Sequence, residues 1–296
     1  MRLTIVHETQ YEYASPVLLS QQLMHLTPRV LPRQSCHAHR IAIEPQPVEL
    51  NDAEDYFGNP VTRALFTAPH QALNVRAESE VSVVPRGDDP LARRSSGWEQ
   101  VRDRLRSLEA PPQLEPTEFV FESPYVETFA SLAEYATPSF APGRGLLDGA
   151  ADLMRRIHAD FEFDDAATSV ATPLREVLRR RRGVCQDFAH LMIGALRSLG
   201  LPARYVSGYI LTTPPPGHPR LVGADASHAW VSVHDPTAGW VDFDPTNDCL
   251  ADDEHVTLAW GRDFGDVTPM RGVILGGGEQ TLEVHVTVSP VELHDG

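Results

Sequence analysis

The sequence predicts an α+β fold in which a β-rich N-terminal region precedes a region of mixed helices and strands. Apolar and polar residues alternate through "LTIVHETQYEY" and "ALNVRAESEVSVV", which is the period-2 pattern of a strand. The later segment "GLLDGAADLMRRIHADF" instead repeats its apolar residues at i, i+3 and i+4, as an amphipathic helix does. Strand-like alternation then returns in "ARYVSGYIL", "HAWVSVH" and "WVDFD".

These patterns divide the chain into three predicted parts. Residues 1–86 are expected to form a β-sandwich domain, because their strands are separated by turn residues such as those of "DYFGNPV". Residues 87–124 are rich in proline, glycine, serine and charge and are predicted to be a linker with one short helix at 98–108. Residues 125–296 are predicted to form a catalytic core whose sheet is completed by strands near 255–260 and 280–291.

A helix of about four turns is predicted to begin at Cys185. An apolar stripe at helical spacing runs from Phe188 to Leu199. Gly200 then provides a helix stop, and Pro202 prevents the helix from continuing. Cys185 is therefore expected to occupy the N-terminus of a helix.

Composition excludes several classes of function. The 296 residues carry 25 Lys+Arg and 41 Asp+Glu, a formal net charge of −16, which would repel the phosphates of nucleic acid. No apolar run approaches the roughly 18 residues of a membrane span, so no membrane association is expected. At the N-terminus, in "MRLTIVHETQYEY", polar residues stand at every second position, whereas a signal peptide needs an unbroken apolar stretch. This pattern predicts a cytoplasmic location.

The three cysteines are too few and too widely spaced for a disulfide framework or a zinc site. No metal or cofactor is therefore expected. Cys36 lies in a charged, turn-like stretch and Cys249 follows a turn, and both are predicted to be non-catalytic. Taken alone, Cys185 would also be interpreted as packing, since most buried cysteines are chemically inert.

The surroundings of Cys185 favour a more reactive interpretation. A helix N-terminus carries partial positive charge and free N–H groups, which stabilise a thiolate and can receive the oxyanion formed when the thiolate attacks a carbonyl. The run Arg179–Arg182 adds positive potential, and screening limits its effect. Gly183, which has no Cβ, is predicted to let backbone or substrate approach closely.

A base and an orienting carboxylate follow downstream. His228 begins one predicted strand, Asp244 ends the next, and "DPTAG" at 235–239 is short enough to join them as a hairpin. This arrangement places the two side chains nearly opposite each other. Trp230 is expected to be a packing aromatic that could also form a wall beside His228, whereas His190, five residues beyond Cys185, is expected to point elsewhere.

Two other classes of function remain open on these residues. A metal hydrolase would use His228, His234 and Asp242 or Asp244, although their spacing is not typical of a metal site. A non-catalytic binding or scaffold protein would use the N-terminal region to recruit a partner. The combination of Cys185, His228 and Asp244 favours an enzyme over both.

The chain also resembles the bacterial transglutaminase-like proteins. The resemblance is carried by "GVCQDFAHLMIGALRSLGLPARYVSGYI", "GADASHAWVSVHDPTAGWVDFDPTN" and "WGRDFGDVTPMRGVILGGG", and in the N-terminal region by "HETQYEYASPV" and "DYFGNPV". It implies a papain-like α+β core in which a helix carrying the cysteine packs on an antiparallel sheet. It also implies a Cys-His-Asp triad with Cys185 as nucleophile, His228 as general base and then acid, and Asp244 as the residue that orients it.

Relatives supply a second oxyanion donor from a Trp or Gln upstream of the cysteine, but no Trp lies between Trp98 and Cys185. A tyrosine or Gln186 is the alternative. The triad predicts a thioester formed from a protein or peptide amide. Hydrolysis of that thioester, as in a cysteine peptidase or amidase, is favoured over amine transfer, as in a protein-glutamine gamma-glutamyltransferase. The reason is that the sequence shows no EF-hand-type calcium loop.

Overall fold

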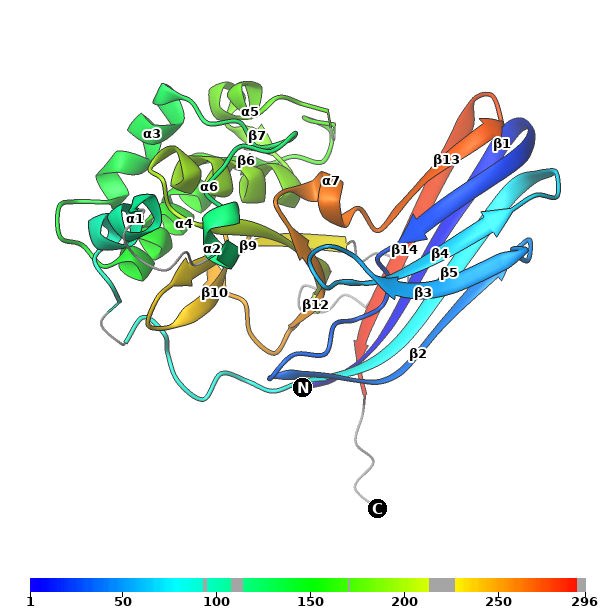
Figure 1. The fold of residues 1–296 in the computed structure, drawn as a ribbon, viewed down its shortest axis with the longest axis horizontal. Helices are drawn as coiled ribbons and strands as arrows, with labels where there is room; N and C mark the ends of the chain where they lie inside the picture. Colours follow the sequence, from blue (N-terminus) through cyan, green and yellow to red (C-terminus); the bar gives the residue numbers. More distant parts are fainter. Residues whose placement is uncertain (93–94, 108–113, 170, 213–226, 292–296) are drawn as a thin grey trace, which may run out of the picture.

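The computed structural model describes residues 1–92, 95–107, 114–169, 171–212 and 227–291, and it has the predicted α+β fold. Two large antiparallel sheets, one small parallel pair of strands and a layer of helices make up the described part of the molecule (Figure 1). The helices cover one face of the second sheet, and the first sheet stands beside them. The sequence also predicts that "LTTPPPGHPRL", at 211–221, is an exposed loop between two strands, and this segment lies from residue 213 onward outside the described residues.

The first sheet confirms that the N-terminal region is rich in strands, but the strands of residues 1–86 belong to one sheet where the sequence predicts a sandwich. It contains β1 (Arg2–Met24), β2 (Gln34–Glu44), β3 (Glu49–Glu54), β4 (Pro60–Phe66), β5 (His70–Val83), β13 (Met270–Gly276) and β14 (Gln280–Pro290). The long strand β1 organises it, because its first half pairs with β5 and β14 and its second half pairs with β4 and β13.

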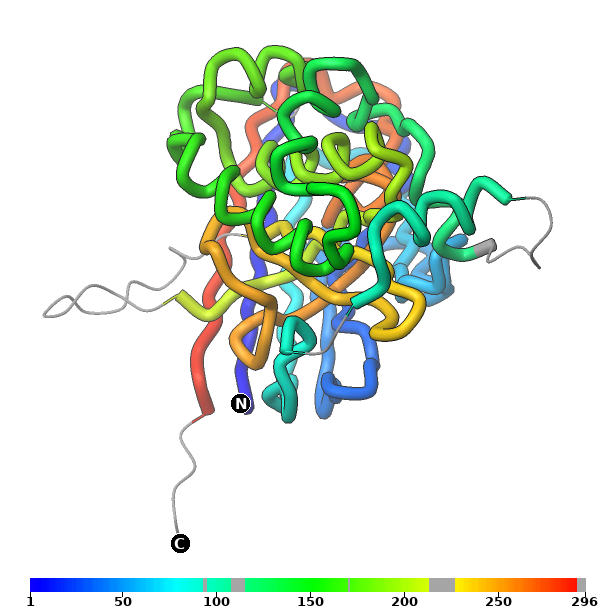
Figure 2. The backbone as a smooth tube through the Cα atoms, turned by 90° about the vertical axis from the view of Figure 1, so that its left-hand side faces the viewer, coloured from blue at the N-terminus to red at the C-terminus, as the bar shows by residue number. Residues whose placement is uncertain are grey.

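The last two strands differ from the prediction. β13 and β14 pair with β1, so the prediction that 280–291 complete the sheet of the core is wrong. Figure 2 shows β14, in red, running beside the blue start of β1. The alternating pattern of β14 indicates one buried face, formed by Val286 and Val288, but it does not specify which sheet the strand joins.

The second sheet has the strand order β11-β10-β9-β8-β12. Its members are β8 (Ala203–Ile210), β9 (Ser227–Asp235), β10 (Gly239–Asp244), β11 (Cys249–Leu250) and β12 (His255–Gly261). The helix α6 (Cys185–Ser198) packs on β8 and β9. The predicted helix that begins at Cys185 and its packing on an antiparallel sheet are therefore confirmed.

The remaining helices surround α6. They are α1 (Trp98–Arg106), α2 (Leu114–Glu118), α3 (Ala130–Ala136), α4 (Leu146–Asp160), α5 (Leu174–Arg180) and α7 (Phe264–Val267). A 3-10 turn, η1 (Thr137–Ser139), follows α3, and the short strands β6 (Glu162–Phe163) and β7 (Arg182–Gly183) pair in parallel. None of the helices in the described ranges combines the length and the apolar character that crossing a membrane requires.

The two sheets are joined by polar contacts around β12. The Gln34 side chain donates to the carbonyl of Thr257 and accepts from its N–H, both at 2.8 Å, as a neighbouring strand would. Asn59 makes the same pair of bonds with Trp260, at 2.8 and 2.9 Å. The N-terminal region therefore fixes the position of β12.

Candidate active site

Cys185 lies at the start of α6 because the backbone between α5 and α6 leaves the helical conformation and returns to it at Cys185. Arg181 ends α5 in the left-handed conformation, with φ of 58°. Val184 is extended, with φ of −110° and ψ of 178°, and α6 begins at the next residue. The N–H of Cys185 is thus one of those that a helix leaves without a partner in its own ladder. The Cys185 side chain is half-buried.

Asp187 explains the glycine that precedes Cys185. Its carboxylate Oδ2 accepts from the N–H of Val184 at 2.9 Å and from the Thr168 hydroxyl at 2.6 Å. A Cβ on Gly183 would lie 2.6 Å from this same Oδ2 atom. The close approach that requires a glycine at 183 is therefore made by the Asp187 side chain, which the sequence does not predict. Burial raises the pKa of Asp187 against the effect of these two hydrogen bonds.

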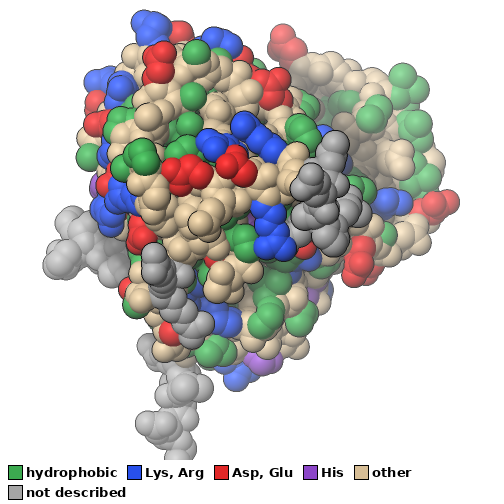
Figure 3. Space-filling model, turned by 60° about the vertical axis from the view of Figure 1, so that its left-hand side comes forward, with side chains coloured by type: hydrophobic (Ala, Val, Ile, Leu, Met, Phe, Trp, Pro, Cys, Tyr) green, Lys and Arg blue, Asp and Glu red, His purple; other side chains and the backbone are tan. Residues whose placement is uncertain are grey.

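The arginine run contributes little to the site. Arg179 and Arg180 both pair with Glu176, at 2.7 and 2.6 Å, while Arg181 pairs with Asp160 at 3.1 Å and Arg182 with Glu162 at 2.8 Å. All four side chains are exposed, and acidic and basic side chains are interspersed over the face drawn in Figure 3. Their charges are therefore compensated locally and screened by solvent.

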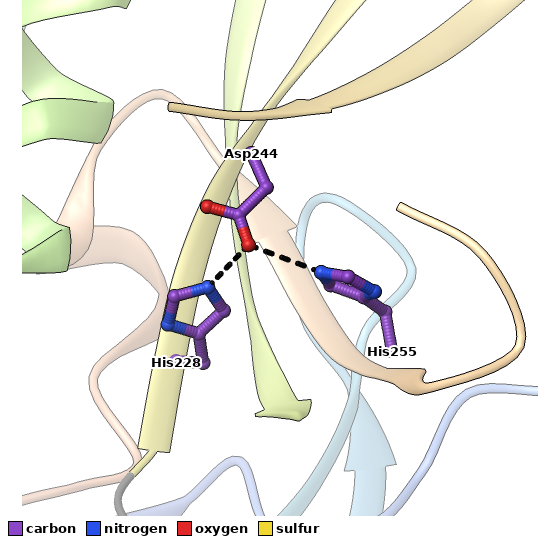
Figure 4. A group of neighbouring side chains, drawn as sticks. All are labelled: His228, Asp244 and His255. Carbon is purple, nitrogen blue, oxygen red and sulfur yellow. Dashed lines mark hydrogen bonds and ion pairs between the residues drawn. The ribbon is translucent and has the colours of Figure 1, made fainter. Parts of the chain in front are cut away.

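His228 and Asp244 meet through the predicted hairpin of β9 and β10. Phe243 pairs with Val231, so the next residue, Asp244, falls opposite Trp230, and His228 is its diagonal neighbour on the same face. The Nε2 atom of His228 lies 2.7 Å from Oδ2 of Asp244. The structure therefore brings together two of the three predicted residues in direct contact (Figure 4).

The Asp244 carboxylate is completely buried and fully hydrogen bonded. The backbone N–H groups of Thr246 and Asn247 donate to Oδ1 at 2.9 and 3.2 Å, and the Asn247 amide donates to Oδ2 at 2.7 Å. Burial alone would raise the pKa of Asp244, but the hydrogen bonds from His228, His255 and Asn247 outweigh it and hold the pKa well below its usual range. Asp244 is therefore an anion at neutral pH.

His255 was assigned no role in the sequence and is the second histidine on this carboxylate. It begins β12, and its Nε2 atom lies 3.1 Å from Oδ2 of Asp244. Figure 4 shows both imidazole rings directed at the same oxygen. No local signal marks this contact, because it depends on how β12 pairs with β8 across the sheet.

Cys185 completes the arrangement from the helix side. Burial lowers the pKa of His228, but the hydrogen bond and charge of Asp244, together with the hydrogen bond and charge of Cys185, outweigh it and raise the pKa to about 10. Since Nε2 of His228 is held by Asp244, Nδ1 is the ring nitrogen left for the thiol. At neutral pH His228 is therefore protonated, and its positive charge acts on Cys185.

Two aromatic residues line this group of side chains. The Trp230 ring lies 6.1 Å from the His228 ring and 5.2 Å from that of His255, so it packs beside both imidazoles. Burial, and then the negative charge of Cys185, raises the pKa of Tyr205 well above its usual value. Tyr205 therefore keeps its hydroxyl proton at neutral pH.

The other cysteines and His190 have different surroundings. His190 is buried, its Nε2 atom accepts from the N–H of Phe264 at 3.1 Å, and burial lowers its pKa to about 3. Burial also raises the pKa of the Cys36 thiol. For Cys249, burial and the charge of nearby Asp244 raise the pKa to about 12. These two thiols stay protonated at neutral pH and are poor nucleophiles.

Part of the same group of residues also has the composition of a metal site. Within the described ranges, His228, Asp244 and His255 form the one set of three whose ligand atoms all lie within 4.8 Å of one another. His234, predicted as a ligand in the metal-hydrolase alternative, instead packs its ring on Trp240 at 5.1 Å. The direct hydrogen bonds at 2.7 and 3.1 Å account for the spacing of the three residues.

The His228–Asp244 pair should make folding stability depend on pH. The pKa of His228 rises from 6.5 to about 10 on folding, so its contribution is complete below pH 6.5 and is lost as the pH rises through 10. The pKa of Asp244 falls on folding, so its contribution is present above about pH 3.9 and is lost as the pH falls through the folded value.

We therefore expect the free energy of unfolding, measured with urea, to decrease from pH 6.5 to pH 10. Asp244→Asn should flatten this decrease, because it removes the charge that raises the His228 pKa. An equal slope in the two proteins would show that the pair is not coupled as described.

Two protein-family models match this chain, one in the N-terminal region and one in the region that contains α6 and most of the second sheet. Residues 3–82 match the model of the bacterial transglutaminase-like N-terminal region, and residues 134–245 match that of the transglutaminase-like superfamily. An uncharacterized protein of Mycobacterium tuberculosis (strain ATCC 25618 / H37Rv) is 40% identical over 98% of this chain and 93% of its own length. An uncharacterized protein of Mycobacterium leprae is 31% identical over 97% of this chain and 98% of its own length.

Two further likenesses are more distant. A solved structure from Cytophaga hutchinsonii, proposed to be a cysteine protease, is 20% identical and superimposes with a TM-score of 0.74 over 100% of this chain and 92% of that one. A protein-glutamine gamma-glutamyltransferase of Pseudomonas aeruginosa is 42% identical over 67 residues, which are 22% of this chain and 10% of that protein. The first likeness shows a shared fold, and the second is confined to a short segment.

Proposed function

Because this chain belongs to the transglutaminase-like superfamily, we propose that it is a thiol enzyme that hydrolyses amide bonds of proteins or peptides through Cys185, His228 and Asp244. One observation carries the proposal. His228 is hydrogen bonded to the buried carboxylate of Asp244 at 2.7 Å, and Cys185, at the start of a helix, is close enough to contribute to the raised pKa of His228. This is the arrangement of an activated nucleophile, its base and the residue that orients the base.

The first half of the reaction uses the proton already on His228. The thiolate of Cys185 attacks the amide carbonyl carbon, and the resulting oxyanion lies at the Cys185 N–H. His228 then gives its proton to the leaving nitrogen, the C–N bond breaks and a thioester remains. Asp244 stabilises the imidazolium and holds its ring in place throughout.

The second half restores the enzyme. His228, now neutral, takes a proton from water as the water oxygen attacks the thioester carbonyl. The C–S bond breaks, the acid product leaves, and the thiolate and the imidazolium are formed again. A primary amine in place of water would give a new amide instead, which is the alternative function as a protein-glutamine gamma-glutamyltransferase.

The experiment is to mix the protein with a library of glutamine- and amide-bearing peptides, with and without a primary amine, and to identify the products by mass. We expect free acids in both mixtures. Amine adducts as the main product would favour the transferase, and the absence of any product would favour a non-catalytic scaffold protein.

A further inference from the structure

A cavity of about 450 Å³ lies between the first sheet and the second. Val83 and Arg86, at and just beyond the end of β5, form one wall, and side chains of β8, β9 and β10 form another. Neither Cys185 nor His228 lines it, so it is separate from the candidate nucleophile. Its size falls within the roughly 300–1,000 Å³ of small-molecule sites.

Buried hydrogen-bond donors without partners are concentrated on the face of the second sheet that lines the cavity. Six buried side-chain polar atoms in the described part of the chain have no hydrogen-bond partner, and three of them belong to Arg204, Trp230 and Ser232. Arg204 Nε and Trp230 Nε1 belong to residues that line the cavity and are 5% and 0% exposed. A buried donor without a partner is unfavourable, so two at one cavity point to an acceptor that binds there.

The Arg204 guanidinium is held in a fixed place. Its Cζ atom lies 4.0 Å from the ring centre of Trp240 and 3.9 Å from that of Trp260, so it is stacked between two indoles. Its Nη1 atom reaches Glu115 at 3.6 Å, which leaves Nε directed elsewhere. Burial lowers the pKa of Arg204 to about 10, so the side chain is still charged at neutral pH.

The lining carries charges of both signs. Arg33 is paired with Asp252 at 2.9 Å, and Glu115 reaches the Nη1 atom of Arg204 at 3.6 Å. An anion would therefore be recognised through the unpartnered N–H groups of Arg204 and Trp230, and not through an excess of positive charge. Apolar side chains that include Val83, Val206 and Ala251 complete the wall.

We propose that this cavity binds a small molecule with one carboxylate and an apolar body. The carboxylate accepts hydrogen bonds from Arg204 Nε and Trp230 Nε1, and the apolar body lies against the aliphatic side chains. Such a ligand would also contact His255, which lines the cavity and bonds Asp244 at 3.1 Å. Binding itself does not depend on the proposed catalytic activity.

The test compares acids with their uncharged counterparts. Phenylacetate, indole-3-acetate and octanoate, each beside its primary amide, are titrated into the protein by calorimetry. We expect at least one acid to bind at least tenfold more tightly than its amide. Trp230→Phe, which keeps a ring and loses the N–H, should weaken that acid about fivefold, and Arg204→Gln should weaken it more.

The matched control is Arg40→Gln, an exposed arginine of β2 paired with Glu78 at 2.9 Å, which should leave the affinity unchanged. Cys185→Ser should also bind the acid normally, which separates this proposal from the proposed function. Equal binding of acids and amides, no binding of any acid, or binding that Trp230→Phe and Arg204→Gln do not weaken would each overturn the proposal.

Discussion

Replacement of Cys185 by serine is expected to reduce amide hydrolysis by about 10³-fold or more while the protein stays folded. The loss follows because serine at this position has no comparable anionic form at neutral pH, and removing the nucleophile of such a group removes most of its effect. Folding should be little affected, since the side chain is small, half-buried and at the first residue of α6. The measurement is the rate of free-acid release from the peptide library.

Cys36→Ser is the matched control for this variant. The Cys36 thiol is half-buried in the first sheet, where burial raises its pKa. Replacing its sulfur by oxygen should leave the rate of free-acid release unchanged. Thermal unfolding of both variants shows whether the fold is kept. A Cys185→Ser protein that releases free acid at the wild-type rate would rule out Cys185 as the nucleophile.

Replacement of Asp244 by asparagine is expected to reduce the rate by about 10²- to 10⁴-fold, since the loss of an orienting carboxylate has effects of this size. The neutral amide cannot stabilise the His228 imidazolium. An amide nitrogen in the Oδ2 position also could not accept from His228, His255 and Asn247, all of which now meet that atom. The pH dependence of the rate should shift together with the rate itself, because the pKa of His228 falls.

Asp248→Asn is the matched control, with the same chemical change four residues further along. Asp248 is exposed and has φ of 51°, a backbone conformation that asparagine adopts readily. This variant should keep the rate and its pH profile. If Asp244→Asn lowered the rate only in proportion to the fraction unfolded, Asp244 would have a structural role and no positioning role.

The parts of the site that the sequence predicts are those set by neighbouring residues. The start of α6 follows from the apolar stripe and from the glycine and proline that end the helix. The contact of His228 with Asp244 follows from one short hairpin turn, and the observed pairing, a diagonal instead of a direct one, differs from the predicted position by two residues. Both depend on segments close together in the chain.

The parts that it does not predict depend on distant pairing. β14 joins β1 across nearly the whole length of the chain, and the alternating pattern of either strand fits many partners. His255 reaches Asp244 only because β12 lies beside β8 and because Gln34 of the first sheet holds β12 in place. The sequence also does not predict why residue 183 is a glycine, because the reason is the close approach of the Asp187 side chain.

The central claim is that His228 and Asp244 activate Cys185 as a nucleophile, and alkylation tests it without knowledge of the substrate. The native protein is treated with iodoacetamide from pH 5 to pH 9, and peptide mapping by mass spectrometry gives the rate at each of the three cysteines. We predict that Cys185 is modified already at pH 6, that Cys36 and Cys249 are not, and that Asp244→Asn slows the reaction at pH 6. Modification of Cys185 that begins only near pH 8.5, as for an ordinary thiol, would contradict the account.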